Sequence, residues 1–233
     1  MPLLAELIVA VVIGYAVGSL PTAYLAGRFF KKTDIRRLGD GNVGAENAYR
    51  ELGPQIGVGV LIIDIGKGAL AVLLIKVVGL GTGPILSAGA AAVAGHNWPV
   101  LLQFKGGRGA ATTVGALLIA LYPAALISGG LGILVLLWGT GEHPKASVRS
   151  LLPREFSGTA ACAATFIPMP FLGWAFGYSV AAIVYSIALP TLVGAVHFYQ
   201  VILPSESPIP LPVEGPPLTN SLAIGPDDPR VGA

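Results

Sequence analysis

A polar, glycine-rich segment, residues 34–50, carries side chains suited to holding an anion. Glycines readily adopt positive φ angles, in which successive backbone N–H groups can point into one concavity and bind phosphate. The glycines of this segment are Gly39, Gly41 and Gly44. Asn42 and Asn47 can donate from their side-chain amides, and Arg50 can bind phosphate oxygens through its guanidinium fork. The segment therefore predicts a phosphate site, with an ordinary glycine-rich turn as the alternative.

A second glycine-rich segment, residues 95–109, combines bases with a histidine and ends where we expect a helix to begin, near Ala110. A helix N-terminus presents free backbone N–H groups and the positive end of the helix dipole. The residues that could hold an anion here are Lys105, Gly106, Gly107, Arg108 and Gly109. We interpret them as a second phosphate-binding element. The alternative is that Lys105 and Arg108 only anchor the chain at a membrane surface.

Histidines and a buried lysine are further candidates. His96 and His197 can each act as an acid, a base or a phosphate donor, because imidazole titrates near neutrality. The alternative for either is a buried histidine at a helix end, bonded to a carbonyl. Lys67 follows Asp64 by three residues, so the two share a helix face and can pair. We interpret the pair as structural, because it limits the cost of a charge in the bilayer and positions Lys67.

Hydroxyl groups near helix ends complete the set of candidates. Ser19 lies just before Pro21, where its hydroxyl can bond backbone groups freed by the proline or reach a ligand. The structural role is the one we favour. Arg154 precedes an expected helix, and Ser157 can cap that helix or hold a phosphate oxygen at its N-terminus.

The composition places these residues on a membrane protein. Of 233 residues, 54% are hydrophobic and 11% are charged, whereas soluble domains carry about 25% charged residues. Apolar stretches recur from Leu3 to Val201, and a spanning helix needs about 20 such residues. We predict one all-α, membrane-embedded bundle over residues 1–203. Cys162 is the only cysteine, which excludes an intrachain disulfide and a multi-cysteine metal site.

The hydropathy pattern predicts where the helices run. The apolar stretches cover residues 3–27, 55–79, 84–102, 110–140, 156–174 and 176–201. The stretch 110–140 is too long for one span. We divide it at Tyr122 and Pro123, because a proline disfavours a helix that continues through the preceding residue. The result is a bundle of about seven transmembrane helices.

The distribution of charge predicts the orientation. Residues 28–37 are rich in Lys and Arg, so the positive-inside bias places them in the cytosol, with the N-terminus outside and the C-terminus cytosolic. Helices that begin near Gln55, Ala110 and Phe156 then direct their positive dipole ends at the cytosolic surface, where they can converge on one anion. Residues 204–233 are crowded with proline, and we predict a disordered cytosolic tail.

Several of these pieces, taken together, resemble the bacterial membrane acyltransferases that move a fatty acyl group from acyl phosphate to glycerol 3-phosphate. The matching pieces are residues 18–24, 39–50, 64–68 and 95–112. The resemblance implies seven membrane helices, a site at the inner membrane that is open to the cytosol, and lysophosphatidic acid as product. It implies no metal and no cofactor, and glycerol 3-phosphate, acyl phosphate and membrane lipid as partners rather than nucleic acid. The acceptor's own phosphate would help to deprotonate its hydroxyl.

The same resemblance suggests roles for individual residues. The candidate catalytic residues are Asp40, Asn42, His96 and His197. The candidate substrate-binding residues are Ser19, Gly39, Gly41, Gly44, Asn47, Arg50, Lys67, Lys105, Gly106, Gly107, Arg108, Gly109, Arg154 and Ser157.

The chain departs from the family's pattern at charged positions. Asp40 and Glu46 stand where the family usually has Ser and Thr, and Arg108 stands where it usually has Lys. Arginine keeps the positive charge but binds through a planar fork. A carboxylate close to an anionic substrate is repulsive unless a cation compensates.

These departures leave alternatives beside acyl transfer to glycerol 3-phosphate in phospholipid synthesis. One is a divergent paralogue with altered or lost activity. Another is a membrane anion transporter with the same phosphate-binding features. Transport requires access from both faces of the membrane, yet the polar residues concentrate on one.

Overall fold

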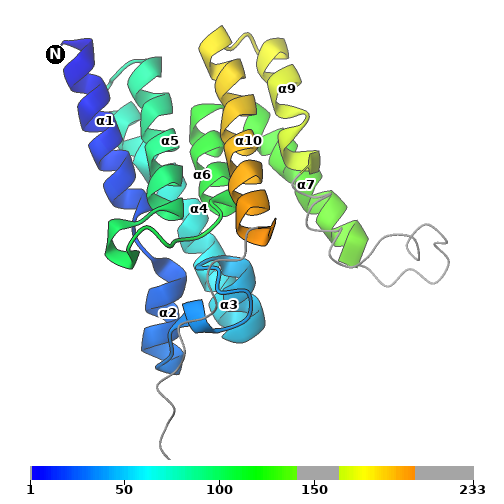
Figure 1. Ribbon diagram of the computed structural model, residues 1–233. Helices are drawn as coiled ribbons and strands as arrows, with labels where there is room; N and C mark the ends of the chain where they lie inside the picture. The colour runs from blue at the N-terminus through cyan, green and yellow to red at the C-terminus, as the bar shows by residue number, and fades with distance from the viewer. Residues whose placement is uncertain (1, 141–162, 203–233) are drawn as a thin grey trace, which may run out of the picture. The chain divides into compact units, whose positions relative to one another are not determined.

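The computed structural model describes residues 2–140 and 163–202, and this part of the chain contains helices and no strands (Figure 1). The helices are α1 (Leu3–Gly18), α2 (Thr22–Lys31), η1 (Ile35–Arg37), α3 (Ala45–Glu51), α4 (Pro54–Val77), α5 (Thr82–Asn97), η2 (Val100–Leu102), α6 (Ala110–Ala120), α7 (Ala124–Thr140), α9 (Met169–Ala175) and α10 (Val180–Ile202).

Apolar helices of membrane-spanning length confirm the predicted fold class. Among the described residues, the segments long and apolar enough to cross a membrane are Leu3–Lys31, which contains both α1 and α2, Pro54–Val77, Thr82–Leu102 and Val180–Gln200, and shorter apolar helices accompany them. The predicted division at Tyr122 and Pro123 is also confirmed, because α6 ends at Ala120 and α7 begins at Ala124. The count of about seven spans and the sidedness of the termini stay predictions.

The first predicted span, residues 3–27, is wrong as a single helix. α1 ends at Gly18, and α2 begins only at Thr22. Pro21 explains the break, because proline has no N–H to donate and its ring clashes with the preceding turn of a helix. α2 then continues past the predicted end to Lys31. The break leaves the Leu20 carbonyl at a helix end, where side chains can reach it.

The segment 34–50, predicted as a loop, contains η1 and the short helix α3. Asp34 caps η1 by accepting from the Arg36 backbone N–H at 3.0 Å, and it forms an ion pair with the Arg36 guanidinium at 2.7 Å. The hydrogen bond from the Arg36 side chain lowers the pKa of Asp34, although burial opposes this. Arg36 also lies over the Tyr24 ring at 5.1 Å, which fixes η1 against α2.

A small hydrophobic core holds both glycine-rich segments together. Its buried members come from α2, η1, the Gly39–Gly44 loop, α3, α4 and η2, and they are Ala23, Ile35, Val43, Ala48, Leu52, Val60 and Leu102. Because Leu102 lies in the second glycine-rich segment and Val43 lies in the first, this core fixes the distance between the two segments.

Close helix contacts hold the spanning helices. α1 packs along α5, and α4 packs along α6 (Figure 1). Gly14 and Gly18 of α1 lie against the backbone of Ala88 and Ala92 of α5, so closely that an added Cβ would overlap it. Gly68 brings α4 equally close to α6. Small residues at such contacts let helix backbones approach within a membrane, where association depends on close packing.

Candidate phosphate-binding site

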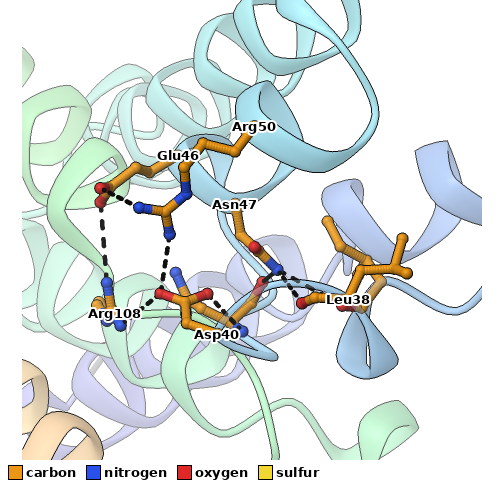
Figure 2. A network of polar contacts seen from close by, with 8 residues as sticks. Leu38, Asp40, Glu46, Asn47, Arg50 and Arg108 are labelled. Atoms are coloured by element: carbon orange, nitrogen blue, oxygen red, sulfur yellow. Dashed lines mark hydrogen bonds and ion pairs between the residues drawn. The ribbon is translucent and has the colours of Figure 1, made fainter.

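Two arginines from different segments converge on one carboxylate (Figure 2). Asp40 Oδ2 lies 3.2 Å from Arg50 Nη2 and 2.8 Å from Arg108 Nη2. Glu46 completes the arrangement, with Oε1 3.2 Å from Arg50 Nη1 and Oε2 3.8 Å from Arg108 Nη1. We call these residues, Asp40, Glu46, Arg50 and Arg108, the ion-pair cluster. Both guanidinium groups thus contact both carboxylates, and the formal charges of the cluster cancel.

The ion-pair cluster is partly open to solvent. The side chain of Arg108 is 14% exposed and that of Asp40 is 31% exposed, whereas Glu46 is 67% exposed. Ion pairs at such a surface are weakened by water and salt. The carboxylates are therefore exchangeable partners of the arginines, and Arg108 is the better buried of the two cations.

Glycine geometry explains the shape of the first segment. Gly39 and Gly41 have φ angles of 56° and 70°, as predicted, and they flank Asp40. Asp40 Oδ1 in turn accepts a hydrogen bond from the Asn42 backbone N–H at 3.2 Å. A positive φ angle was also expected at Gly44, and this is wrong, because its φ of −138° is ordinary extended backbone at the start of α3.

Asn47 holds this loop from inside. It is fully buried, and its Nδ2 donates to the carbonyls of Leu38 and Asn42, each at 3.0 Å (Figure 2). Its amide protons are therefore committed to the loop, which favours a positioning role over direct contact with substrate. Asn42 is buried beside it, with Oδ1 unpartnered among the described residues.

The second segment folds back onto the end of α5. The backbone N–H of Gly106 donates to the Asn97 carbonyl and that of Gly107 to the His96 carbonyl, both at 3.1 Å. A Cβ on Gly107 would overlap His96 Nε2 and lie 2.8 Å from the Val43 carbonyl oxygen, so this glycine is where the two segments meet. Residue 107 must therefore be a glycine for the segments to make this contact.

The predicted helix start is also confirmed. Gly109, at φ 83°, precedes α6, which begins at Ala110, and its carbonyl accepts from Thr113 N at 2.8 Å. Lys105 is exposed and stands outside the ion-pair cluster.

A second polar group lies deeper in the bundle. Lys67 Nζ lies 2.9 Å from Asp64 Oδ1 and donates to the Leu20 carbonyl at 3.0 Å, which confirms the predicted pair. His96 Nδ1 lies 3.8 Å from the same Asp64 oxygen, and all three side chains are buried. Ser19 is buried next to them, against Gly95. The helix break at Pro21 supplies the carbonyl that holds Lys67, so the structure favours a structural role for this lysine.

The remaining candidates divide into one near the cluster and two that are not described. His197, near the end of α10, lies within electrostatic range of Arg108, Glu46 and Asp40. Arg154 and Ser157 lie outside the described residues.

Glu46 was missed as a site residue, although its spacing of four from Arg50 on one helix was a usable signal. Within residues 2–140 and 163–202, no group of His, Cys, Asp and Glu could hold a metal ion.

Sequence comparisons point to one family. A sequence model described as glycerol-3-phosphate acyltransferase matches residues 8–203. Glycerol-3-phosphate acyltransferase 4 of Dehalococcoides mccartyi (strain ATCC BAA-2266 / KCTC 15142 / 195) is 42% identical over 190 residues, which are 82% of this chain and 94% of that relative. Glycerol-3-phosphate acyltransferase 2 of Moorella thermoacetica is 52% identical over 121 residues, which are 51% of this chain and 60% of that relative.

Solved structures share the fold. The crystal structure of PlsY, an integral membrane glycerol 3-phosphate acyltransferase in its glycerol 3-phosphate form, is similar with a TM-score of 0.67 and 28% identity, over 84% of this chain and 90% of that chain. Its lysophosphatidic acid form is similar with a TM-score of 0.65 and 26% identity, over 84% of this chain and 92% of that chain.

Proposed function

Because this chain belongs to the glycerol-3-phosphate acyltransferase family, and so transfers an acyl group to glycerol 3-phosphate in phospholipid synthesis, we propose that its acyl donor is an acyl phosphate. An acyl phosphate is a mixed anhydride whose carbonyl carbon is already activated. Both substrates then carry phosphate, so the site needs oriented cations and backbone donors more than a nucleophilic side chain. The family assignment also favours acyl transfer over anion transport.

The convergence of Arg50 and Arg108 carries this proposal. Their Nη2 atoms lie 3.2 Å and 2.8 Å from a single oxygen, Asp40 Oδ2. A phosphate oxygen at that point would receive charge-assisted hydrogen bonds from both guanidinium groups. The neighbouring Asn42 backbone N–H points at the same carboxylate. The site therefore offers two cations and a backbone donor to one small anion.

The reaction needs no covalent enzyme intermediate. A hydroxyl oxygen of glycerol 3-phosphate attacks the acyl carbonyl carbon, an ester bond forms, and the bond from that carbon to the phosphate oxygen breaks. The hydroxyl proton passes to a phosphate oxygen of the acceptor or of the leaving group. Arg50 and Arg108 reduce the repulsion between the two anionic substrates and orient the hydroxyl, while the acyl chain lies between helices.

We place the ion-pair cluster at the cytosolic face of a bacterial inner membrane. This placement is supported by the basic residues that precede the cluster in sequence, which are Arg28, Lys31, Lys32, Arg36 and Arg37. Loops rich in Lys and Arg stay in the cytosol during insertion. This orientation puts the N-terminus outside and the C-terminus inside, and it exposes the site to water-soluble glycerol 3-phosphate.

A comparison of donors tests the proposed reaction. Purified protein is mixed with glycerol 3-phosphate and either an acyl phosphate or a thioester of the same chain length, and lysophosphatidic acid is measured. We expect product from the acyl phosphate and a background level from the thioester, because the carbonyl carbon of a thioester carries no phosphate leaving group for the site to bind. Equal rates from both donors would exclude acyl phosphate as the specific substrate.

A further inference from the structure

We propose that the carboxylate of Asp40 occupies the position between Arg50 and Arg108 where the phosphate of glycerol 3-phosphate binds. By competing for this position, Asp40 weakens the binding of this substrate and so sets its affinity. The inference rests on the proposed role of the two arginines in binding phosphate. It gives Asp40 a role in substrate affinity in place of a catalytic one.

The contacts of Asp40 are those expected of a bound phosphate. One of its oxygens, Oδ2, meets Arg50 Nη2 at 3.2 Å and Arg108 Nη2 at 2.8 Å. The other oxygen, Oδ1, accepts the Asn42 backbone N–H at 3.2 Å. Two guanidinium groups and a loop N–H are the donors that a phosphate would need here. The carboxylate and the substrate therefore compete for the same donors.

Charge makes this competition strong. Glu46 also contacts both arginines, at 3.2 Å from Arg50 and 3.8 Å from Arg108, so the cluster as a whole is neutral. A phosphate dianion that approached it with Asp40 in place would meet a carboxylate at close range and no net positive charge. Binding of the substrate therefore requires Asp40 to leave the arginines.

The surroundings allow Asp40 to leave without moving Arg108. Only the Asp40 side chain needs to rotate, because Asn47 holds the loop backbone on either side of it through the Leu38 and Asn42 carbonyls. Asp40 is 31% exposed, so its carboxylate can turn into water. Arg108 is only 14% exposed and follows the constrained Gly106 and Gly107 turn, so it keeps its place.

The expected size of the effect follows from the fraction of molecules in which the arginines are free. The apparent Kd is the intrinsic Kd divided by that fraction, so a carboxylate bound in nine molecules of ten weakens binding roughly tenfold.

Substitution of Asp40 by asparagine tests the proposal. Asp40→Asn keeps the shape of the side chain and an oxygen acceptor for Asn42 N–H, and it replaces the charged oxygen that faces the arginines with a neutral amide nitrogen. We expect Kd and KM for glycerol 3-phosphate to fall roughly tenfold, with kcat within about twofold of the wild-type value. The matched control is Glu6→Gln, which removes a negative charge from the first turn of α1, outside the ion-pair cluster and both glycine-rich segments, and should leave Kd and KM unchanged.

Several outcomes would overturn the proposal. An unchanged or higher Kd in Asp40→Asn would mean that the carboxylate does not compete with phosphate. A fall in kcat of roughly a hundredfold would identify Asp40 as a general base that touches the reacting atoms. If Asp40→Asn does not fold, Glu46→Gln replaces it, because Glu46 is 67% exposed; a lower Kd, by a smaller factor, is expected, and no change would count against the proposal.

Binding is measured by calorimetry with glycerol 3-phosphate alone, so this result does not depend on the acyl donor. A failure of the donor comparison would leave the binding result intact. A failure of the binding prediction would leave acyl transfer intact.

Discussion

Arg108→Ala is expected to lower kcat/KM for glycerol 3-phosphate roughly a hundredfold or more, because a hydrogen bond to a charged group contributes about 1.5–3 kcal/mol and a guanidinium can make two. Arg108 is the better buried cation of the ion-pair cluster, at 14% exposure. Without it, Asp40 and Glu46 face Arg50 alone, and the cluster acquires a net negative charge. The rate of lysophosphatidic acid formation by purified protein measures the effect.

Two companion variants separate charge from geometry. Arg108→Lys keeps the charge and loses the planar fork, so an intermediate loss is expected. Arg37→Ala removes an exposed basic residue of the first glycine-rich segment, outside the ion-pair cluster, and should leave kcat/KM within about twofold of the wild-type value. If folded Arg108→Ala kept wild-type kcat/KM, Arg108 would have no part in substrate binding.

Asp64→Ala is expected to destabilise the fold by about 3–5 kcal/mol, because it leaves the charge of a buried lysine without its partner. Lys67 is 4% exposed, and its Nζ lies 2.9 Å from Asp64 Oδ1. Its remaining contact is the Leu20 carbonyl at 3.0 Å, which cannot neutralise the charge. The midpoint of thermal unfolding in a single detergent measures the loss.

A charge-free replacement of the pair tests whether the loss comes from the orphaned charge. The double variant Asp64→Leu with Lys67→Met should recover most of the stability, because a buried ion pair can often be replaced by apolar side chains of similar volume. Lys76→Gln, an exposed basic position on the same helix, is the control and should leave the midpoint unchanged. A wild-type midpoint for Asp64→Ala would contradict the structural role of the pair.

Hydropathy predicted the class of fold, and turn chemistry predicted several boundaries. The division at Tyr122 and Pro123 and the start of α6 after Gly109 are set by local backbone constraints, so they could be read from the sequence. The break after Gly18 was missed because the apolar pattern continues across it. α3 was missed because it is short, and because the glycines before it suggested a loop.

The candidate site was predictable in its residue types and only partly in its arrangement. Glycines and bases near helix ends indicated an anion site, and the structure brings Arg50 and Arg108 together. The structure also shows that Asn47 donates to the carbonyl of Leu38 and that Lys67 donates to the carbonyl of Leu20, which residue spacing alone could not reveal. Lys67 and Leu20 are distant in sequence, and the contacts of Asn47 depend on how residues 38–42 fold back against α3.

A double-mutant cycle on glycerol 3-phosphate binding tests most directly whether Arg50 and Arg108 hold one anion. Kd is measured for Arg50→Ala, Arg108→Ala and the double variant. Substitutions at independent sites have additive free energies, so their fold-losses multiply, whereas residues that share a partner are coupled. We predict that the double variant loses less affinity than the product of the single losses, because either loss already displaces the shared phosphate. Losses that multiply would contradict a common site.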